Sequence, residues 1–283
     1  MPANIIIPAD VPENKKNEFI QNCKTITKNT NNLFLFAGDQ KVEHLNKDFY
    51  GANIHSDAQK PTHLFEIANK GHVGVFATQL GLINRYAQNY KNINYCVKLN
   101  SKTDLLAKEN HDPISKQLWT VEQVVKIKNF GIPIKAVGYT VYLGSEFENI
   151  MLQEAAKIIF QAHQEGLIAI LWMYPRGKNI KDEKNANLIA GAAGIANCLG
   201  ADFAKINPPE NASDLQQAVM AAGNTKLICS GGKAKEESIF LQELKDQITI
   251  GGTAGCAVGR NIHNLELSKA IKMTQKIEII IYK

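Results

Sequence analysis

Residues 136–174 read AVGYTVYLGSEFENIMLQEAAKIIFQAHQEGLIAILWMY, and this stretch indicates the fold class. The apolar, β-branched runs at 136–142 and 168–174 predict two buried strands. Between them, apolar residues recur at three- and four-residue steps over about 146–165, which predicts a helix. Ser145 and Glu148 match a capping box at its start, and Gly166 matches a C-terminal stop. Strand, helix and strand in this order are typical of a parallel sheet covered by helices.

The same alternation recurs along the rest of the chain. Predicted strands occupy 33–39, 73–78, 95–100, 136–142, 168–174, 202–207, 226–231 and 248–252, and a helix-like segment follows each of them. Eight such units are the number that closes a (β/α)8 barrel. An open doubly wound sheet is the rival, but no GxGxxG follows the first strand. We therefore predict an α/β protein with the (β/α)8 TIM-barrel fold.

Both ends of the chain lie outside this alternation. The length of 283 residues suits one domain, 1–283, with a barrel core over about 33–275. The first 30 or so residues, rich in Asn and Lys, form an N-terminal extension, and KIEIIIYK at 276–283 is an apolar C-terminal tail. Two interpretations of the tail stay open: a cap packed on the barrel, or a strand added to another subunit.

Composition narrows the class of protein. The net charge of +5, from 32 basic and 27 acidic residues, is scattered, which favours a phosphorylated small ligand over nucleic acid. The five cysteines are odd in number and lack CxxC spacing, which favours a reducing compartment over disulfides or a zinc ribbon. No signal-peptide pattern and no apolar run near the ~20 residues of a membrane span is present. We predict a soluble cytoplasmic protein with no nucleic-acid or membrane partner.

Polar residues follow the predicted strands at the ends where TIM barrels place their chemistry. These residues are Asp39, Lys98, Asn100, Trp172, Tyr174, Lys205, Asn207 and Ser230. Lys205 stands within the apolar run FAKI, where burial would lower its pKa from ~10.4 and leave a nucleophilic amine. The alternative is a lysine that ends the strand and reaches water. Strand parity puts Trp172 and Tyr174 on one face, so these side chains can converge on one concave site.

Two glycine-rich segments follow the last two strands, where barrels often bind phosphate. They are SGGK at 230–233 and GCAVGRN at 255–261. Glycine lets backbone N–H groups approach an anion closely. Only three of the basic residues are arginines, Arg85, Arg176 and Arg260, and bidentate phosphate or carboxylate contacts require arginine rather than lysine. Tight turns without a ligand are the alternative.

A set of motifs in order resembles a known family. The motifs are AGDQKVEH (37–44), VKLN (97–100), AVGYTVYLGSEFE (136–148), WMYPRG (172–177), GADFAKIN (200–207), CSGGK (229–233) and AVGRNI (257–262). Together they resemble the archaeal-type class I fructose-1,6-bisphosphate aldolases, within a barrel group that includes deoxyribose-phosphate aldolase. The resemblance implies a sugar-phosphate substrate, no metal or other cofactor, and a homo-oligomer. It implies cleavage of fructose 1,6-bisphosphate to dihydroxyacetone phosphate and glyceraldehyde 3-phosphate, a reaction of glycolysis and gluconeogenesis.

The resemblance also implies roles for residues. Lys205 would form the Schiff base, Tyr174 would transfer protons, and Asp39 would hold substrate hydroxyls and orient the lysine. Substrate contacts would come from Trp172, Arg176, Lys98 and His44. Phosphate would bind at Ser230, Gly231, Gly232, Gly255, Gly259 and Arg260. Many family members have DHG after the first strand, whereas this chain has Asp39-Gln40-Lys41, which leaves the roles of Glu43 and His44 open.

Three alternatives stay open. The first is a related Schiff-base aldolase that makes a deoxy-amino-heptulosonate for aromatic amino-acid synthesis. The second is a zinc-dependent class II aldolase, which needs histidine ligands. The seven histidines show no close pair at metal spacing; they are residues 44, 55, 63, 72, 111, 163 and 263. The third is a non-catalytic barrel that binds a sugar phosphate.

Overall fold

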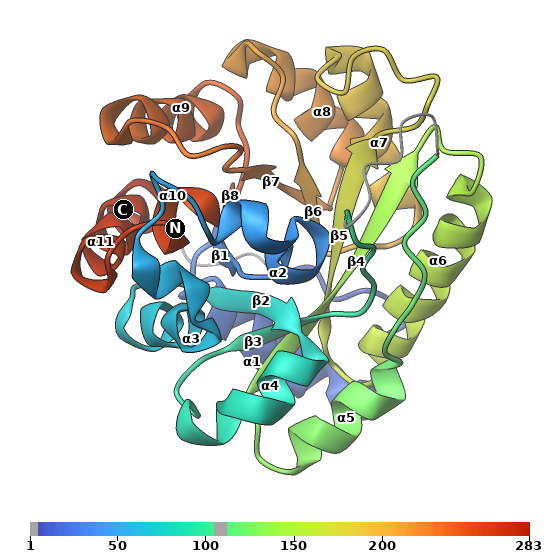
Figure 1. The fold of residues 1–283 in the computed structure, drawn as a ribbon. Helices are drawn as coiled ribbons and strands as arrows, with labels where there is room; N and C mark the ends of the chain where they lie inside the picture. Colours follow the sequence, from blue (N-terminus) through green and yellow to red (C-terminus); the bar gives the residue numbers. More distant parts are fainter. Residues whose placement is uncertain (1–4, 105–111) are drawn as a thin grey trace.

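The computed structural model describes residues 5–104 and 112–283, and in them eight parallel strands close into a barrel (Figure 1). The strands are β1 (Leu33–Ala37), β2 (Val75–Gln79), β3 (Tyr95–Lys98), β4 (Ile134–Leu143), β5 (Ile168–Pro175), β6 (Phe203–Ile206), β7 (Lys226–Ser230) and β8 (Gly255–Val258). Each strand pairs with the next in sequence, and β8 returns to β1 with Phe36 opposite Val258. The predicted TIM barrel is confirmed.

Helices surround the ring of strands (Figure 1). They are α1 (Lys16–Ile26), α2 (Gln40–Glu43), α3 (Pro61–Lys70), α4 (Leu80–Tyr86), α5 (Val121–Asn129), α6 (Glu148–Gln164), α7 (Ala186–Cys198), α8 (Leu215–Ala222), α9 (Glu237–Thr249), α10 (Arg260–His263) and α11 (Leu267–Tyr282). Short 3-10 turns cover Glu13–Lys15, Leu45–Asp48, Ser56–Gln59, Ala87–Asn89 and Ala212–Asp214. Within the described ranges, none of the helices is long and apolar enough to cross a membrane.

The side chains of the strands point either to an outer, apolar face or to an inner face. The inner face becomes polar toward the carboxyl-terminal ends of the strands, which form the mouth of the barrel. On the outer face, Phe36 of β1 stacks on Phe76 of β2 with ring centres 5.3 Å apart, and Phe76 meets Phe65 of α3 edge-on. Because successive residues of a strand point to opposite faces, Asp39 points inward, one residue beyond the outward Gly38, whose added Cβ would meet Phe76. Burial of the outer face therefore orients the inner residues.

One predicted strand was wrong. Residues 248–252 were expected to form the eighth strand, but α9 continues to Thr249 and a turn follows. The strand that closes the barrel is instead Gly255–Val258. The ITIGG run is apolar over too few residues to distinguish a helix end from a strand by periodicity. Pairing with β1 and β7 decides the matter.

The predicted capping box at α6 is also displaced. The Ser145 hydroxyl accepts a hydrogen bond from the Phe147 amide at 3.2 Å, and the Glu148 carboxylate accepts one from the Gly144 amide at 2.6 Å. Each side chain thus caps an amide, but neither forms the reciprocal pair that was expected. The Ser145 hydroxyl also donates to the Pro113 carbonyl at 2.7 Å, which ties the loop after β4 to the loop after β3.

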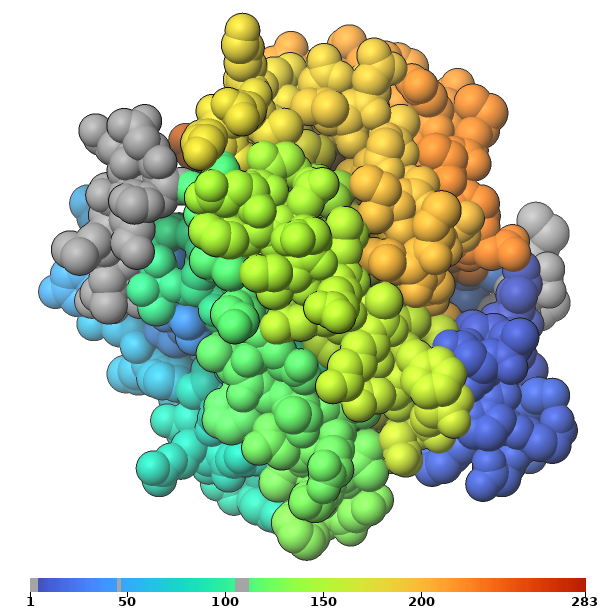
Figure 2. Space-filling view, turned by 90° about the vertical axis from the view of Figure 1, so that its right-hand side faces the viewer, coloured from blue at the N-terminus to red at the C-terminus, as the bar shows by residue number. Residues whose placement is uncertain are grey.

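The N-terminal extension packs at the amino-terminal end of the barrel, beside α5 and α6 (Figure 2). The Asn22 amide donates to the Gly166 carbonyl at 2.9 Å, and Glu18 forms an ion pair with Lys128 of α5. The buried His163 of α6 bonds the Asp10 carboxylate through Nδ1 at 2.8 Å. The extension is therefore fixed to the barrel by polar contacts.

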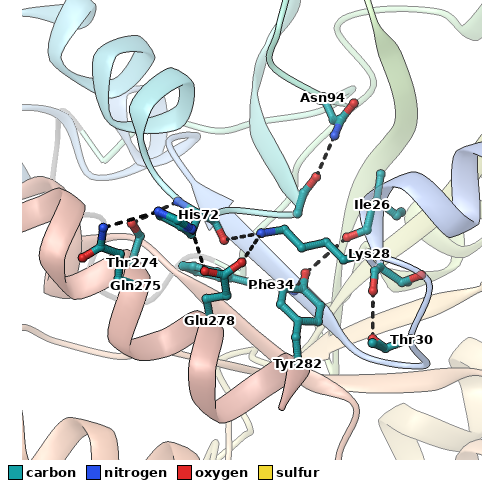
Figure 3. Close-up of polar contacts among 12 residues, drawn as sticks. Ile26, Lys28, Thr30, Phe34, His72, Asn94, Thr274, Gln275, Glu278 and Tyr282 are labelled. Carbon is teal, nitrogen blue, oxygen red and sulfur yellow. Dashed lines mark hydrogen bonds and ion pairs between the residues drawn. The ribbon is translucent and has the colours of Figure 1, made fainter. Parts of the chain in front are cut away.

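The C-terminal tail is a helix that caps the barrel, and its interpretation as an added strand was wrong. At the end of α11, the Tyr282 hydroxyl accepts a hydrogen bond from the Phe34 amide at 3.0 Å and donates to the Ile26 carbonyl at 3.3 Å (Figure 3). One turn earlier, Glu278 binds Lys28 at 2.5 Å and His72 at 2.6 Å. The tail thus joins the loop before β1 to the loop before β2.

Candidate active site

The central feature of the mouth is Lys205, which β6 holds on the inner face of the barrel. Its residue is 6% exposed, and Nζ lies 5.3 Å from the centre of the Trp172 ring on β5. Among the described residues, its ammonium has no hydrogen-bond or ion-pair partner. Burial lowers the pKa of Lys205, and the positive charges of Lys98 and Arg260 act in the same direction. The charges of Asp39 and Glu43 oppose this shift, so the neutral amine is favoured by burial rather than by pairing.

Trp172 lies between two lysines because a glycine leaves room for its indole. A Cβ added to Gly138 on β4 would fall 2.4 Å from the ring. Lys98 of β3 is fully buried, and its Nζ also lies 5.3 Å from the ring centre. Lys98 donates to the side chain of Asn100 at 3.1 Å and lies 3.8 Å from a Glu43 oxygen. The indole thus lies against both lysines, and the ion pair with Glu43 additionally holds Lys98.

Tyr174 lies two residues beyond Trp172 on the same strand face, nearer the mouth. Burial raises the pKa of its phenol well above the ordinary value, and the charges of Asp39 and Glu43 raise it further. The phenol therefore stays protonated near neutral pH, which suits a proton donor. Its ring stacks on that of Tyr142 at the end of β4, with centres 6.5 Å apart.

Asp39 lies two residues beyond β1, directly before α2, and is 4% exposed. The charge of its carboxylate raises the pKa of both Lys205 and Tyr174. Glu43, one turn later on α2, accepts a long hydrogen bond of 3.5 Å from the Ser101 hydroxyl. Two carboxylates thus face a buried amine and a buried phenol, and Lys98 is paired with the second of them.

The loops after β7 and β8 meet at the opposite side of the mouth. Ser230 bonds Asn207 at 2.8 Å, and the amide of Gly231 donates to the Ala257 carbonyl at 3.0 Å. Asn261 of α10 ties the two loops together, because its side chain donates to the Gly231 carbonyl at 2.8 Å and accepts from the Lys235 amide at 2.9 Å. Gly232 has φ +65, a conformation that glycine adopts without strain.

Arg260 and His44 belong to one polar network beside these loops. Arg260 Nε donates to the Gly232 carbonyl at 3.0 Å, and Nη1 lies 3.4 Å from an Asp48 oxygen. The other Asp48 oxygen is 2.5 Å from His44 Nδ1. Gly259, which precedes Arg260, packs so closely against α2 that an added Cβ would lie 2.3 Å from the Gln40 side chain. The structure thus brings the two glycine loops and α2 together.

The assignment of Gly255 to this loop was wrong. Gly255 is the first residue of β8 and pairs with Leu33, the first residue of β1. It therefore lies at the amino-terminal end of the barrel, one strand length away from Gly259. Its φ is +123, and an added Cβ would fall 2.2 Å from the Leu33 carbonyl oxygen, so this glycine serves close strand packing.

The guanidinium of Arg176 faces protein groups. It forms a two-bond pair with Glu183, with Nε to Oε1 and Nη2 to Oε2 both at 2.6 Å. Its carbon lies 5.6 Å from the centre of the Tyr174 ring. Neither Glu183 nor Tyr142 is among the site residues predicted from the sequence. Tyr142 lies four residues after Gly138 on β4, so the alternation of side chains along a strand places both residues on the same face. That alternation could have predicted Tyr142, whereas no nearby motif indicated Glu183.

The described histidines lie in several separate environments, although His63 Nε2 is 3.2 Å from the His263 carbonyl oxygen. Across 5–104 and 112–283, no group of three or more His, Cys, Asp or Glu side chains is placed to hold a metal ion. His111 lies outside the described residues. His163 is buried against Asp10 and Asp202, away from the mouth. His263 is buried on α10, three residues after Arg260, and stacks on Phe49 with ring centres 4.5 Å apart.

The sequence matches one protein-family model over most of its length. The model described as DeoC/LacD family aldolase matches residues 33–265, from the start of β1 to the turn after α10. A curated protein of Methanocaldococcus jannaschii, named fructose-bisphosphate aldolase/6-deoxy-5-ketofructose 1-phosphate synthase, is 53% identical over 281 residues. The alignment covers 98% of this chain and 90% of that protein.

Two solved structures share the fold throughout. A fructose-bisphosphate aldolase from Slackia heliotrinireducens superposes with a TM-score of 0.96 at 50% identity, covering 98% of this chain and 90% of that one. An archaeal fructose-1,6-bisphosphate aldolase, solved with its catalytic lysine bound to the carbinolamine intermediate of the substrate, superposes with a TM-score of 0.82 at 29% identity. That alignment covers 94% of this chain and all of the other, 100%.

Proposed function

This chain belongs to the DeoC/LacD family of aldolases, and we propose that it is a class I aldolase that cleaves and forms fructose 1,6-bisphosphate through a Schiff base. The observation that carries the proposal is Lys205, a buried lysine on the inner face of β6 whose pKa is lowered by burial. The solved relative with a lysine-bound carbinolamine supports the same chemistry.

In the proposed reaction, the neutral amine of Lys205 attacks the C2 ketone of the open-chain sugar. The carbinolamine loses water and becomes an iminium, which withdraws electrons from the adjacent carbon. Tyr174 first gives its proton to the hydroxyl that leaves the carbinolamine as water. The resulting phenolate then accepts the proton of the C4 hydroxyl while the C3–C4 bond breaks, and the bond electrons form an enamine. Glyceraldehyde 3-phosphate leaves, Tyr174 returns the proton to C3, and water releases dihydroxyacetone phosphate from Lys205.

The neighbours of these two residues have supporting roles in the proposal. Asp39 holds substrate hydroxyls beside Lys205, and Trp172 excludes water from the iminium. Lys98 is a second cation within the same wall, suited to hydroxyl or phosphate oxygens. The loop amides around Gly232 and Gly259–Arg260 bind a substrate phosphate in this proposal, because glycine-rich turns and helix starts can direct N–H groups at an anion. The amide of Gly231, in contrast, is already paired with the Ala257 carbonyl. His44 supports this loop through Asp48 and Arg260.

A second activity of the same site is favoured by the 53% identity to the Methanocaldococcus jannaschii protein, whose name includes 6-deoxy-5-ketofructose 1-phosphate synthase. Dividing that sugar at C3–C4 yields dihydroxyacetone phosphate and 2-oxopropanal. The enamine on Lys205 would then add to 2-oxopropanal in place of glyceraldehyde 3-phosphate. This acceptor has no phosphate, so only the phosphate of the first fragment needs a site.

Reductive trapping tests the proposal. The enzyme is mixed with dihydroxyacetone phosphate, reduced with borohydride and digested, and the adduct is located by mass spectrometry. We expect one adduct, on Lys205, and none in Lys205→Met, while the surface variant Lys245→Met is trapped like wild type. Binding of dihydroxyacetone phosphate without an adduct would favour the non-catalytic barrel.

Turnover separates the remaining alternatives. The proposal expects cleavage of fructose 1,6-bisphosphate that survives EDTA. Turnover confined to precursors of the deoxy-amino-heptulosonate would favour that pathway instead. The homo-oligomer and the cytoplasmic location stay predictions, checked by light scattering of the purified protein and by fractionation of cells.

A further inference from the structure

A guanidinium–carboxylate pair borders the proton-transferring side of the mouth. Arg176 directly follows β5, and its amide donates to the Leu143 carbonyl at 2.8 Å, so its backbone continues the β4–β5 pairing. Its side chain forms two parallel bonds of 2.6 Å with Glu183, which lies in the loop before α7. Such a two-bond fork fixes the plane of a guanidinium, which a single contact does not.

The fixed guanidinium lies against two tyrosine rings. Its carbon is 5.6 Å from the centre of Tyr174 and 5.7 Å from that of Tyr142, and the two rings stack with 30° between their planes. Tyr142 is fully buried, so it supplies a rigid support on one side of Tyr174. The guanidinium of Arg176 also contacts the Tyr174 ring, and Glu183 holds this guanidinium in place.

We propose that the Glu183–Arg176 pair is a positioning device for Tyr174, holding the phenol at the angle from which it exchanges a proton with C3 of the bound substrate. This inference rests on the proposed function and assigns Arg176 to the tyrosine rather than to the substrate. Lysine would not replace Arg176, because an ammonium can neither form the fork nor stack flat on a ring. Arg176 is one of only three arginines in a lysine-rich chain.

The charge of Arg176 also acts on the phenol. Burial raises the pKa of Tyr174, and Arg176 opposes that rise. The charged and titratable groups that face Tyr174 from the surrounding elements are Asp39, Glu43, Tyr142, Arg176 and Arg260. Removing Arg176 leaves the two carboxylates opposed only by Arg260, so the phenol gives up its proton less readily.

Two measurements separate positioning from chemistry at the lysine. Exchange of the C3 protons of dihydroxyacetone phosphate with D2O, followed by NMR, requires proton transfer, whereas borohydride trapping on Lys205 requires only the iminium. We expect Glu183→Gln and Arg176→Lys to slow exchange at saturating substrate about tenfold. Trapping and the KM of exchange stay within twofold of wild type. Glu122→Gln, which removes the exposed ion pair with Lys126 on α5, is the matched control and exchanges normally.

Arg176→Ala gives a sharper test, since about a third of the side chain is exposed and a small cation can enter the vacated space. Guanidinium at tens of millimolar should restore part of the exchange in this variant but not in Tyr174→Phe. Without guanidinium, the pH at which exchange reaches half its maximum should move upward. If Glu183→Gln exchanged protons as fast as the control Glu122→Gln, the inference would be overturned. It would also be overturned if Glu183→Gln or Arg176→Lys lost trapping and exchange to the same extent. Failure of wild type to trap would instead refute the proposed function.

Discussion

Nζ of Lys205 lies 5.3 Å from the centre of the Trp172 ring, and the two residues stand opposite each other in the β5–β6 register. Nζ of Lys98 lies at the same distance from the same ring. The two amines differ in their partners: Lys98 bonds Asn100 and approaches Glu43, whereas Lys205 has the ring alone among the described residues. Of the two, Lys205 has the environment of a nucleophile, whereas Lys98 is held by hydrogen bonds and an ion pair.

The first prediction concerns the pH dependence of Schiff-base formation. Because burial lowers the pKa of Lys205, its neutral form is present at lower pH than in an ordinary lysine. Cyanoborohydride trapping with dihydroxyacetone phosphate should therefore rise with pH around a midpoint below ~10.4. The charge of Asp39 raises this pKa, so Asp39→Asn should move the midpoint further down. An upward movement in Asp39→Asn would contradict this account of the site.

The second prediction concerns the space that Gly138 leaves for Trp172. In Gly138→Ala the new Cβ would fall 2.4 Å from the indole, so the ring must shift relative to Lys205 and Lys98. We expect a loss of about 1–3 kcal/mol in the free energy of unfolding. Trapping at Lys205 should also slow about tenfold, since small displacements of reacting groups are costly. Urea unfolding and trapping rates measure the two effects.

A matched glycine serves as the control for this substitution. Gly81 in α4 has nothing within 4 Å of an added Cβ. Gly81→Ala should raise the free energy of unfolding by up to about 1 kcal/mol, because alanine favours the helix, and should leave trapping unchanged. If Gly138→Ala behaved like Gly81→Ala, the indole would not be confined as described.

The third prediction concerns His163, far from the mouth. Burial lowers its pKa, but hydrogen bonds and charges of Asp202 and Asp10 outweigh burial, so the net pKa is raised. A raised folded-state pKa adds stability that is complete below the unfolded value of ~6.5 and is lost as pH rises through the folded value. His163→Gln should cost about 2 kcal/mol at pH 6 and less at pH 9. Urea unfolding at both pH values checks this, and an equal cost at both would refute it.

The fourth prediction concerns the C-terminal cap. Tyr282→Phe leaves the Phe34 amide without the hydroxyl that accepts its hydrogen bond (Figure 3). An unpaired buried amide costs about 1–3 kcal/mol, which should appear in the free energy of unfolding. Tyr50→Phe, at a side chain that is 65% exposed, should change it by less than about 0.5 kcal/mol. Equal stability of the two variants would mean that the tail does not hold β1 as described.

Much of the barrel could be predicted from local pattern, because a buried parallel strand is a short apolar run and a helix has its own period. Seven strands were predicted close to their observed positions, and the Lys205 strand was among them. The eighth strand was misplaced, because ITIGG and GCAV are both short and apolar and only pairing with β1 distinguishes them. That error also placed Gly255 among the phosphate-binding residues, at the wrong end of the barrel.

Local sequence pattern is enough to predict the eightfold alternation, the lysine within an apolar strand and the polar residues at strand ends. These features depend on residues that are close together in the sequence, so the periodicity of strands and helices is enough to predict them. The contacts between side chains distant in sequence follow from the folded chain alone: Glu183 with Arg176, Arg176 with Tyr174, and Arg260 with Asp48. Such contacts depend on barrel closure and on the paths of loops between strands, and no local period encodes either of them.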